Sequence, residues 1–459
     1  MGKRIIVIGA GAAGLMAAAA AAGNGHSVTI LEKNEKAGKK IYITGKGRCN
    51  LTNDCSTEDF FAHVARSRKF LYSAVYGFDQ EQVKVFFTEN GCPVKVERGN
   101  RVFPVSDHAS DVTAALLRET GRKGVRILYH TAAESILAEQ AGGDGLQVQG
   151  VRLKDGRTMP ADAVILCTGG LSYPSTGSTG DGLVMARALG LQVTETAPSL
   201  VPFETKEMWC RELQGLALRN VAVRIFPLPK QEGGDDRREP AGEAGTEPGK
   251  DTRGESIQDA RTIRKKSGRK KKKNKPVYEA FGELLFTHFG LSGPIILTAS
   301  CYCDFHENPQ GFRLFLDLKP ALSTEQLRER LRREFSLAPN RHLPAAVRPL
   351  FPARLAEAVT MLTGLETDRR AASFTEREIA GMASLIKEIP VTITGTRGYA
   401  EAIVTRGGIS VTEFNPSTME SKKVRGLYAA GEVLDVDAET GGFNLQIAWS
   451  TGHLAGSSV

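Results

Sequence analysis

The sequence has few of the residues that cross-link a chain or bind metals. Its 459 residues include seven cysteines, and no two of them stand in a CxxC spacing. Their odd number and wide scatter exclude a framework of paired disulfides and indicate a reducing compartment. Cys301 and Cys303 are expected to lie on one face of a strand. No HExxH or paired CxxC motif occurs, so the sequence predicts no metal site.

Long apolar runs are also scarce. The uncharged stretch from Ile5 to Gly25 is long enough to span a membrane by count alone. Three glycines within six residues, and the polar exit at residues 23–26, fit neither a membrane span nor a signal peptide. We therefore expect no membrane association and a cytoplasmic protein.

Acidic residues do not balance the basic ones, and the formal net charge is +8. Most of the excess lies in residues 230–275, which hold almost no apolar side chains. Within them, Arg264 to Lys275 carries nine cations and no acids, whereas residues 230–263 carry six cations and nine acids. A segment with so little apolar surface to bury is predicted to be a disordered surface loop with a basic end.

The N-terminus carries the strongest motif. A short isoleucine-rich run, Arg4–Ile8, precedes the glycine turn at residues 9–14, and an alanine-rich stretch follows to about Ala22. A second apolar run, Ser27–Leu31, ends at Glu32. Strand, glycine turn, helix, strand and acid follow one another as in a dinucleotide-binding unit.

Each glycine of this turn has a physical task. Gly9 allows the tight turn, Gly11 allows the backbone to approach a pyrophosphate, and Gly14 allows the helix to pack closely on the strand. The helix N-terminus offers free N–H groups and a partial positive charge to phosphates. Glu32 is placed to accept hydrogen bonds from the hydroxyls of an adenosine ribose.

Two later segments distinguish FAD from a simple nicotinamide cofactor. Residues 164–170 are a buried strand that ends in glycines, and residues 426–432 repeat that pattern near the C-terminus. Residues 440–444 then lead into a helix-like stretch from Leu445 to His453. A late strand of this kind brings an acid and a helix N-terminus to the flavin ring, where the helix end stabilises negative charge. A simple NAD-dependent dehydrogenase has no need of this return, so we expect FAD.

Several longer motifs resemble one family. They are Gly38–Asn53 (GKKIYITGKGRCNLTN), Thr168–Pro174 (TGGLSYP), Phe286–Pro294 (FTHFGLSGP), Arg406–Ile409 (RGGI), Thr418–Ser421 (TMES) and the C-terminal segment. The chain is similar to the aminoacetone-oxidase-like flavoproteins. That family also includes 3-dehydro-bile-acid reductases and the flavin enzymes that make dihydrouridine in large-subunit ribosomal RNA. The likeness covers the chain except residues 230–275, and it is specific for the family but not for a substrate.

The resemblance implies an α/β fold with a discontinuous FAD-binding Rossmann-like domain over residues 1–195 and 395–459. Into it a β-rich, barrel-like domain (residues 196–320 and 389–394) and a helical subdomain (residues 321–388) would be inserted. The sequence pattern supports this independently, with strands at 201–203, 221–226, 283–286 and 312–318 and helices at 324–335 and 353–362. The cofactor is expected to contact Gly9, Gly11, Ala13, Gly14, Glu32, Lys40, Gly45, Gly47, Asn50, Thr168, Gly169, Gly170, Gly431, Glu432, Gly442, Asn444 and Leu445.

A flavin reductase also needs a proton donor, and the resemblance places the loop Gly45–Asn50 at the flavin face. Arg48 is a candidate to stabilise an enolate-like oxygen or the reduced flavin, and Cys49 a candidate proton donor. The alternative for Cys49 is a small buried filler. His288 is either an acid near the substrate or a structural histidine. Tyr173 is either a phenolic donor or an aromatic packed at a turn.

The leading hypothesis is reduction of an activated C=C bond by reduced FAD. No second GxGxxG occurs, so NAD(P)H is expected to bind transiently, or another donor to reduce the flavin. Uridine in large-subunit ribosomal RNA would account for the basic Arg264–Lys275 as a tether to phosphates. The alternatives are an unsaturated 3-oxo bile acid, a small amine oxidised with O₂, and a non-enzymatic RNA-binding protein with a structural flavin.

Overall fold

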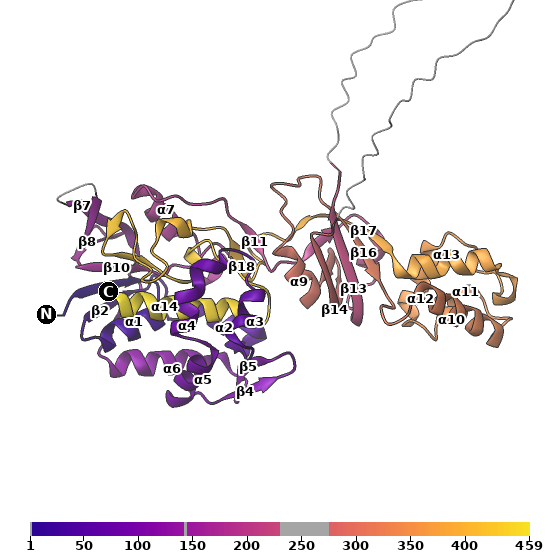
Figure 1. Ribbon diagram of the computed structural model, residues 1–459, viewed down its shortest axis with the longest axis horizontal. Coiled ribbons are helices and arrows are strands. Elements are labelled where there is room, and N and C mark those ends of the chain that lie inside the picture. The colour runs from indigo at the N-terminus through magenta and orange to yellow at the C-terminus, as the bar shows by residue number, and fades with distance from the viewer. Residues whose placement is uncertain (1, 142–144, 230–274) are drawn as a thin grey trace, which may run out of the picture.

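The computed structural model describes residues 2–141, 145–229 and 275–459. The predicted surface loop over residues 230–275 lies outside the described residues apart from Lys275. The described chain forms three bodies in a row (Figure 1). The largest holds both termini, a barrel lies in the middle, and a group of helices lies at the far end.

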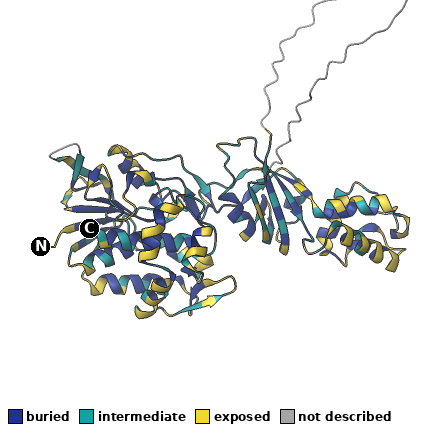
Figure 2. Cartoon of the chain, in the orientation of Figure 1, coloured by how far each residue is buried: buried dark blue, intermediate teal, exposed yellow. Residues whose placement is uncertain are grey.

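A parallel sheet organises the largest body. Its strands run in the order β20 (Leu427–Ala429), β10 (Ala163–Leu166), β1 (Arg4–Ile8), β2 (Ser27–Leu31) and β6 (Arg126–Leu128), all paired in parallel. The inner strands are almost continuous apolar runs and are buried, as expected for a sheet covered on both faces (Figure 2). Chain segments from both ends of the sequence therefore share one sheet.

Helix α1 (Ala12–Gly23) and helix α14 (Phe443–Ser458) pack together beside this sheet. The two helices approach so closely that only glycine fits at their contact. A Cβ at Gly452 would lie 2.5 Å from the carbonyl oxygen of Ala13. A Cβ at Gly456 would lie 2.1 Å from that of Ala17. The contact fixes the N-terminus of α14 against the first dinucleotide-binding unit.

The other elements of this body surround the sheet. Its remaining helices are α2 (Lys39–Ile43), α3 (Thr57–Ala62), α4 (Tyr72–Gly77), α5 (Gln80–Glu89), α6 (Ala109–Arg122), α7 (Asp181–Ala188) and the 3₁₀ turns η1 (Thr44–Gly47), η2 (Arg68–Leu71), η3 (Pro174–Thr176), η5 (Val411–Glu413) and η6 (Gly431–Val433). Its smaller sheets contain β3 (Thr52–Asn53), β4 (Val94–Glu97) and β5 (Arg101–Pro104); β7 (Ala133–Ala141), β8 (Gly145–Leu153), β9 (Thr158–Pro160) and β19 (Val424–Arg425); and β11 (Ala197–Ser199) with β18 (Val404–Arg406).

The middle body is a closed barrel. Its strands run in the order β12 (Phe203–Thr205), β15 (Gly290–Ser292), β14 (Tyr278–Thr287), β13 (Ala217–Pro227), β16 (Phe312–Asp317) and β17 (Ile389–Thr396). Alternate residues of β16, Phe312, Leu314 and Leu316, are fully buried, which is the period of a strand with one face inward. Helices α8 (Met208–Glu212) and α9 (Pro294–Ser300) accompany the barrel.

The third body is helical. It contains α10 (Thr324–Leu337), α11 (Leu343–Val347), α12 (Ala353–Leu362), η4 (Ala371–Ser373) and α13 (Glu376–Lys387). Capping boxes begin α10 at Ser323 and α13 at Thr375, each with its partner three residues on. Pro390 then follows in β17, where the chain returns to the barrel.

The predicted fold class is confirmed: a parallel nucleotide-binding sheet carries an inserted β-barrel and a group of helices. The domain boundaries drawn from the sequence stay a prediction. One expectation is wrong. Cys301 and Cys303 do not share a strand, because the chain leaves α9 at Ser300 and turns there, and both thiols are buried. Among the helices of the described residues, none is both long and apolar enough to cross a membrane.

Candidate cofactor site

A cleft opens at the carboxyl ends of β1, β2, β10 and β20. It contains about 1360 Å³ of empty space, including the part that opens to solvent. Its wall joins the glycine turn after β1, Glu32 after β2, Thr168 after β10 and Glu432 after β20. The carboxyl edge of a parallel sheet is where such folds bind their ligands.

The glycine turn has one side packed and one side open. Gly9 has φ +103°, and a Cβ there would lie 2.6 Å from the carbonyl oxygen of Cys167. A Cβ at Gly14 would lie 1.9 Å from the carbonyl oxygen of Gly9, so strand and helix approach as closely as predicted. A Cβ at Gly11, in contrast, would have no atom of the described chain within 4 Å. The open side faces the cleft and leaves room for a pyrophosphate.

Helix α1 presents its N-terminus to this space. Gly11 is its N-cap, and within the described chain no side chain caps it. The N–H groups of the first turn therefore remain available to an anion, and the helix dipole favours negative charge there.

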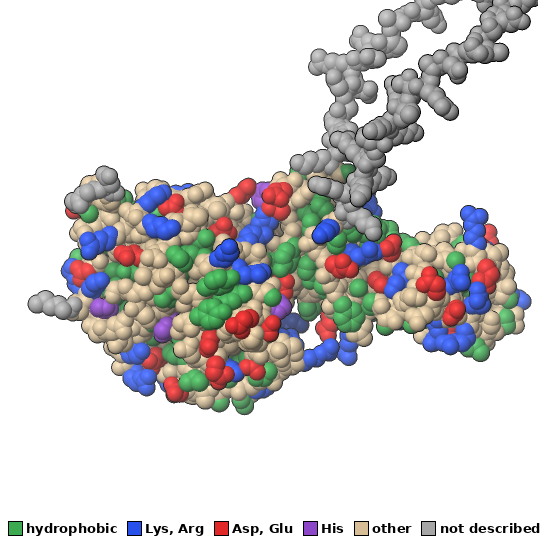
Figure 3. All heavy atoms as spheres, viewed as in Figure 1, with side chains coloured by type: hydrophobic (Ala, Val, Ile, Leu, Met, Phe, Trp, Pro, Cys, Tyr) green, Lys and Arg blue, Asp and Glu red, His purple; other side chains and the backbone are tan. Residues whose placement is uncertain are grey.

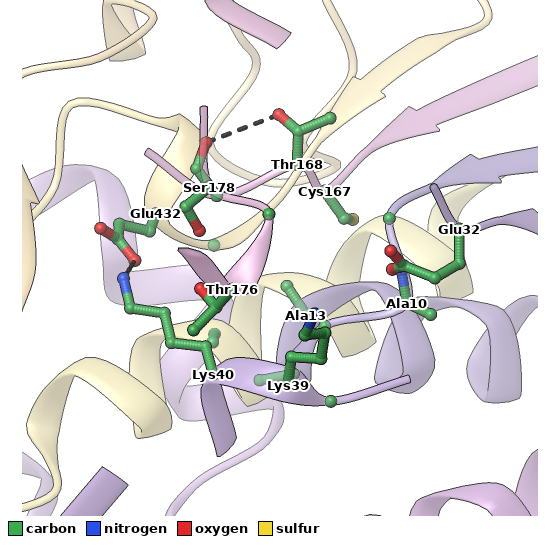
Figure 4. Close-up of a pocket in the computed structure, with 18 of the residues that line it drawn as sticks. Ala10, Ala13, Glu32, Lys39, Lys40, Cys167, Thr168, Thr176, Ser178 and Glu432 are labelled. Atoms are coloured by element: carbon green, nitrogen blue, oxygen red, sulfur yellow. Dashed lines mark hydrogen bonds and ion pairs between the residues drawn. The ribbon is translucent and has the colours of Figure 1, made fainter. Parts of the chain in front are cut away.

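Glu32 is fixed at one end of the cleft (Figure 4). Its Oε2 accepts a hydrogen bond from the N–H of Ala10 at 2.9 Å. Its Oε1 accepts from the N–H and from Nδ2 of Asn34, both at 2.8 Å. The side chain is 7% exposed, so the carboxylate is held in one orientation with lone pairs left for ribose hydroxyls.

A half-buried ion pair marks the other end of the cleft. Lys40 Nζ donates to Glu432 Oε2 at 2.7 Å and to Ser172 Oγ at 2.5 Å. Ser172 Oγ and the N–H of Thr405 donate to Glu432 Oε1 at 2.6 and 2.8 Å. Burial alone would raise the pKa of Glu432, but the charge of Lys40 and these hydrogen bonds outweigh it and hold that pKa below its usual value. Figure 4 shows Lys40 and Glu432 pointing at one another, across the glycine turn from Glu32.

The N-terminus of α14 lies beside the cleft at this second end. Gly442 is its N-cap with φ +101°, and a Cβ there would lie 2.4 Å from the backbone of Thr52. The Asn444 side chain accepts from the N–H of Ala438 at 3.0 Å and donates to the carbonyl oxygens of Ala438 and Glu439. Asn444 and Leu445 line the cleft, so the helix end is firmly positioned for a ligand.

Most of the predicted cofactor residues line this cleft: Gly9, Gly11, Ala13, Glu32, Lys40, Thr168, Gly169, Gly431, Glu432, Asn444 and Leu445. Gly14, Gly170 and Gly442 stand behind the wall: Gly14 and Gly442 allow close backbone approaches, and Gly170 leaves room for the side chain of Thr405. Gly45, Gly47 and Asn50 belong to the loop that follows α2 and do not line the cleft.

That loop is tightly bent. Gly45, Lys46, Gly47 and Cys49 all have positive φ, between +59° and +85°. Asn50 follows, and its buried Oδ1 has no hydrogen-bond partner in the described part of the chain. A buried acceptor of this kind is costly unless a ligand brings it an N–H group. A flavin ring offers such an N–H, so the residue fits FAD.

Two of the predicted catalytic residues sit in the same loop but face away from the cleft. Cys49 is 0% exposed in the apolar core, and burial raises the pKa of its thiol. Arg48 stacks over the ring of Phe103 at 4.1 Å and bonds Glu97 and Asp107. Arg48 thereby ties the loop to the β4–β5 hairpin, and Cys49 has the surroundings of an inert core thiol.

The other two predicted catalytic residues lie elsewhere. His288 is exposed between β14 and β15, with its ring edge-on to Phe289 at 4.9 Å. Tyr173 has φ +49° and begins η3, and burial followed by the charge of Glu401 raises the pKa of its phenol. In the described structure, none of the four predicted catalytic residues lines the cleft.

Several cleft residues were missed from the sequence. Asn34 was the most accessible to prediction, because it follows the ribose-binding acid by two residues and bonds it. Lys33 and Asp181 form an ion pair at 2.5 Å on the cleft wall. Ile403, Val404, Met185 and Ala133 come from distant segments and carry no local signal.

The comparisons with known proteins agree with this site. A family model described as "HI0933-like protein Rossmann domain" matches residues 3–458. A 3-dehydro-bile acid delta(4,6)-reductase of Clostridium scindens is 29% identical over 461 residues, covering 100% of this chain and 99% of that protein. A ribosomal RNA dihydrouridine synthase of Escherichia coli is 29% identical over 446 residues, covering 97% of this chain and 95% of that protein.

Solved structures are more distant. A 3-ketosteroid delta1-dehydrogenase from Sterolibacterium denitrificans aligns with a TM-score of 0.49 and 14% identity, over 99% of this chain and 98% of that one. The family model, in contrast, matches nearly the whole chain, and the cleft has the features of a dinucleotide site. The chain therefore belongs to the HI0933-like Rossmann domain family, and it is an FAD-binding oxidoreductase.

Proposed function

We propose that this protein uses NAD(P)H to reduce a C=C bond conjugated to a carbonyl group, and that its substrate is a uracil ring in large-subunit ribosomal RNA. The observation that carries the proposal is the cleft, whose two ends are built for a dinucleotide that bears a second ring system. Glu32 stands at the ribose end, and the Lys40–Glu432 pair and the N-terminus of α14 stand at the other.

The residues present fit FAD from end to end. Glu32 would bind the adenosine ribose, the N-terminus of α1 at Gly11 would bind the pyrophosphate, and Asn444 would border the flavin ring. Bound FAD supplies a two-electron carrier that receives a hydride from one substrate and gives it to another. The N-terminus of α14 would place partial positive charge near the ring, which favours the reduced, anionic form, whereas the charge of Lys40 is balanced by Glu432.

The names of the relatives support the choice of reaction. One is a delta(4,6)-reductase of a 3-dehydro-bile acid, and two are ribosomal RNA dihydrouridine synthases. In both cases the product names imply that a C=C bond conjugated to a carbonyl is reduced. A single chemistry, hydride to the β-carbon and a proton to the α-carbon, serves both substrates.

The charge of the chain favours ribosomal RNA over a bile acid as the substrate. Arg264 to Lys275 carries nine cations and no acids in the sequence. Exposed arginines at positions 333, 341 and 377 add cations on the helical body, where Figure 3 shows Lys and Arg side chains among acidic ones. Neutralising phosphates is the main source of affinity for nucleic acid.

A small enone is the second candidate. It is favoured by one observation, the bile acid reductase whose alignment spans all of this chain. A small substrate would need no basic segment, so the two candidates differ in what removal of Arg264–Lys275 does.

The test is reduction of each acceptor by the purified protein. FAD-loaded protein is reduced anaerobically with NADPH or NADH and mixed with an unmodified large-subunit rRNA transcript or with a 3-oxo-4,6-diene bile acid. We expect rRNA to reoxidise the flavin with formation of dihydrouridine. A variant lacking residues 264–275 should load FAD normally but bind rRNA more weakly, with a shallower dependence on salt. Reoxidation by the bile acid alone would select the second candidate, and reoxidation by neither would reject the proposal.

A further inference from the structure

A chain of three hydrogen-bonded side chains crosses from the barrel to the nucleotide-binding body. Tyr302 stands in the turn after α9, and its hydroxyl donates to Glu439 Oε1 at 2.8 Å. The other oxygen of that carboxylate, Oε2, accepts from His63 Nδ1 at 2.7 Å. The phenol, the carboxylate and the imidazole are joined in series, which is the arrangement of a proton relay.

This chain lies beside the α14 end of the cleft, and none of its three side chains lines the cleft in the described structure. Glu439 stands between Val436 and Asn444, which both line the cleft, and Asn444 Nδ2 donates to its carbonyl oxygen at 3.2 Å. The ring of His63 stacks on Phe443, the first residue of α14, with centroids 4.4 Å apart and planes 17° apart. The Glu439 carboxylate therefore belongs to the loop that leads into the N-terminus of α14, where the flavin ring is expected.

The barrel supplies an aromatic surface at the same place. Tyr278 of β14 stacks on Tyr302, with ring centroids 5.5 Å apart and planes 21° apart. Thr298 of α9 meets Thr440 across the junction, with their hydroxyl oxygens 3.3 Å apart. Burial, and then the carboxylate of Glu439, raise the pKa of the Tyr302 phenol, so it stays protonated.

The relay reaches water at its other end. The side chain of His63 is 42% exposed, whereas that of Glu439 is 20% exposed. Histidine is the side chain best suited to exchange protons with water near neutral pH. A proton can thus pass from solvent to His63, to Glu439 and to the phenol along bonds that already exist.

The neighbouring charged side chains are engaged in ion pairs and do not form a second proton relay. The Asp437 side chain is 1% exposed; Arg66 Nη1 donates to both of its carboxylate oxygens, at 2.7 and 2.9 Å, and Ser199 Oγ donates to Oδ2 at 3.0 Å. Arg406 pairs with Asp304. These groups hold the two bodies together and expose no proton that is free to move.

We propose that Tyr302 is the acid that protonates the substrate carbon, and that Glu439 and His63 are positioning residues that return a proton to it. The inference rests on the proposed reduction of a conjugated C=C bond. Hydride from reduced FAD forms a C–H bond at the β-carbon, and the electron pair of the C=C bond moves towards the α-carbon and the carbonyl oxygen. The Tyr302 O–H bond then breaks as the α-carbon forms its C–H bond. His63, protonated by water, gives its Nδ1 proton to the Glu439 carboxylate, and the carboxylic acid so formed returns a proton to the Tyr302 phenolate.

The test separates flavin reduction from flavin reoxidation. The wild type, Tyr302→Phe and the exposed control Tyr76→Phe are loaded with FAD, reduced by NADPH, and mixed anaerobically with unmodified rRNA transcript or a 3-oxo-4,6-diene bile acid. In Tyr302→Phe we expect an unchanged rate of flavin reduction and a reoxidation rate lowered roughly 10²-fold or more, the usual worth of a positioned acid. The wild type should show a solvent deuterium isotope effect on reoxidation, and Tyr76→Phe should match it.

A second readout does not depend on an acceptor. A phenol beside the flavin quenches its fluorescence by donating an electron to the excited ring, which a phenyl ring does not do. Tyr302→Phe should therefore lengthen the fluorescence lifetime of the oxidised, FAD-loaded protein, and Tyr76→Phe should not. If Tyr302→Phe loads no FAD, Glu439→Gln takes its place. It keeps an acceptor for the phenol but cannot pass on a proton, and it should slow reoxidation without slowing reduction.

The outcomes are distinct. Reoxidation of Tyr302→Phe or Glu439→Gln as fast as that of the wild type would overturn the inference and leave the proposed function standing. A wild type that neither acceptor reoxidises would overturn the proposed function and the proton role together. The fluorescence lifetime would then still show whether Tyr302 lies against the ring.

Discussion

Lys40 and Glu432 lie 2.7 Å apart although 392 residues separate them in the chain. Lys40 comes from the helix that follows the first dinucleotide-binding unit, and Glu432 from the turn after the last strand of the same sheet. The pair joins the two sequence segments that make the cofactor cleft, and it does so where the flavin is expected. Several consequences can be measured.

Removing one member of this pair should destabilise the protein. Lys40→Met leaves the Glu432 carboxylate without its main counter-charge, and the free energy of unfolding should fall by about 1–3 kcal/mol, between the values for exposed and buried pairs. In the double variant Lys40→Met/Glu432→Gln no unpaired charge remains, so part of that loss should be recovered. Urea unfolding of the wild type, Lys40→Met, Glu432→Gln and the double variant measures the coupling. Equal losses in the single and double variants would show that the ion pair does not stabilise the cleft.

The same pair predicts a dependence of stability on pH. The pKa of Glu432 is held below its ordinary value of 4.5, so the ionised carboxylate favours the folded state. This contribution is fully present above about pH 4.5 and is lost as the pH falls through the lower pKa of the folded protein. Glu432→Gln should therefore lower stability at pH 6 and make the loss on acidification less steep. Parallel stability curves for the two proteins between pH 6 and pH 3 would contradict this.

Two glycines of the turn should respond in opposite ways. A side chain at Gly11 meets no described atom within 4 Å, so Gly11→Val should keep the stability of the protein without cofactor and abolish FAD binding. A side chain at Gly14 meets the carbonyl oxygen of Gly9 at 1.9 Å, so Gly14→Ala should lower the free energy of unfolding by about 1–3 kcal/mol. The flavin absorbance and the thermal midpoint of each variant decide the matter. A yellow Gly11→Val protein, fully loaded with FAD, would show that the pyrophosphate does not bind at this turn.

Cys49 should prove dispensable for catalysis. Its thiol is buried in the core and its pKa is raised by burial, so it should resist alkylation in the folded protein. Cys49→Ala should lose about 1–2 kcal/mol of stability through the removed contacts and retain its rates of flavin reduction and reoxidation. Stopped-flow kinetics beside a urea titration test this. A large loss of reoxidation rate in Cys49→Ala at full FAD loading would show that Cys49 takes part in catalysis.

The cofactor half of the site could be predicted because its signals are local. The turn at Gly9–Gly14 and the acid at Glu32 lie within one short unit whose order fixes its three-dimensional arrangement. The β-rich domain and the helices were also predicted, from the family resemblance together with the strand pattern of residues 312–318 and the helical periodicity of residues 324–335.

The reacting end of the site could not be predicted in the same way. His63, Tyr302 and Glu439 belong to three segments of the chain, and none of them stands in a motif that marks it. They meet only because α9 of the barrel packs against the loop before α14. Cys49 stood in a strong motif, but a positive φ of 60° turns the residue into the core. A motif identifies the loop, whereas the tertiary contacts decide which of its side chains reaches the ligand.

The most direct test of the proposed function is the dihydrouridine content of large-subunit ribosomal RNA, measured by mass spectrometry in cells with and without this protein. The account predicts that dihydrouridine is lost from the rRNA of cells lacking the protein. The wild-type chain should restore it, and the Gly11→Val chain should not. Unchanged dihydrouridine in those cells would contradict the account and leave a small conjugated ketone as the substrate to pursue.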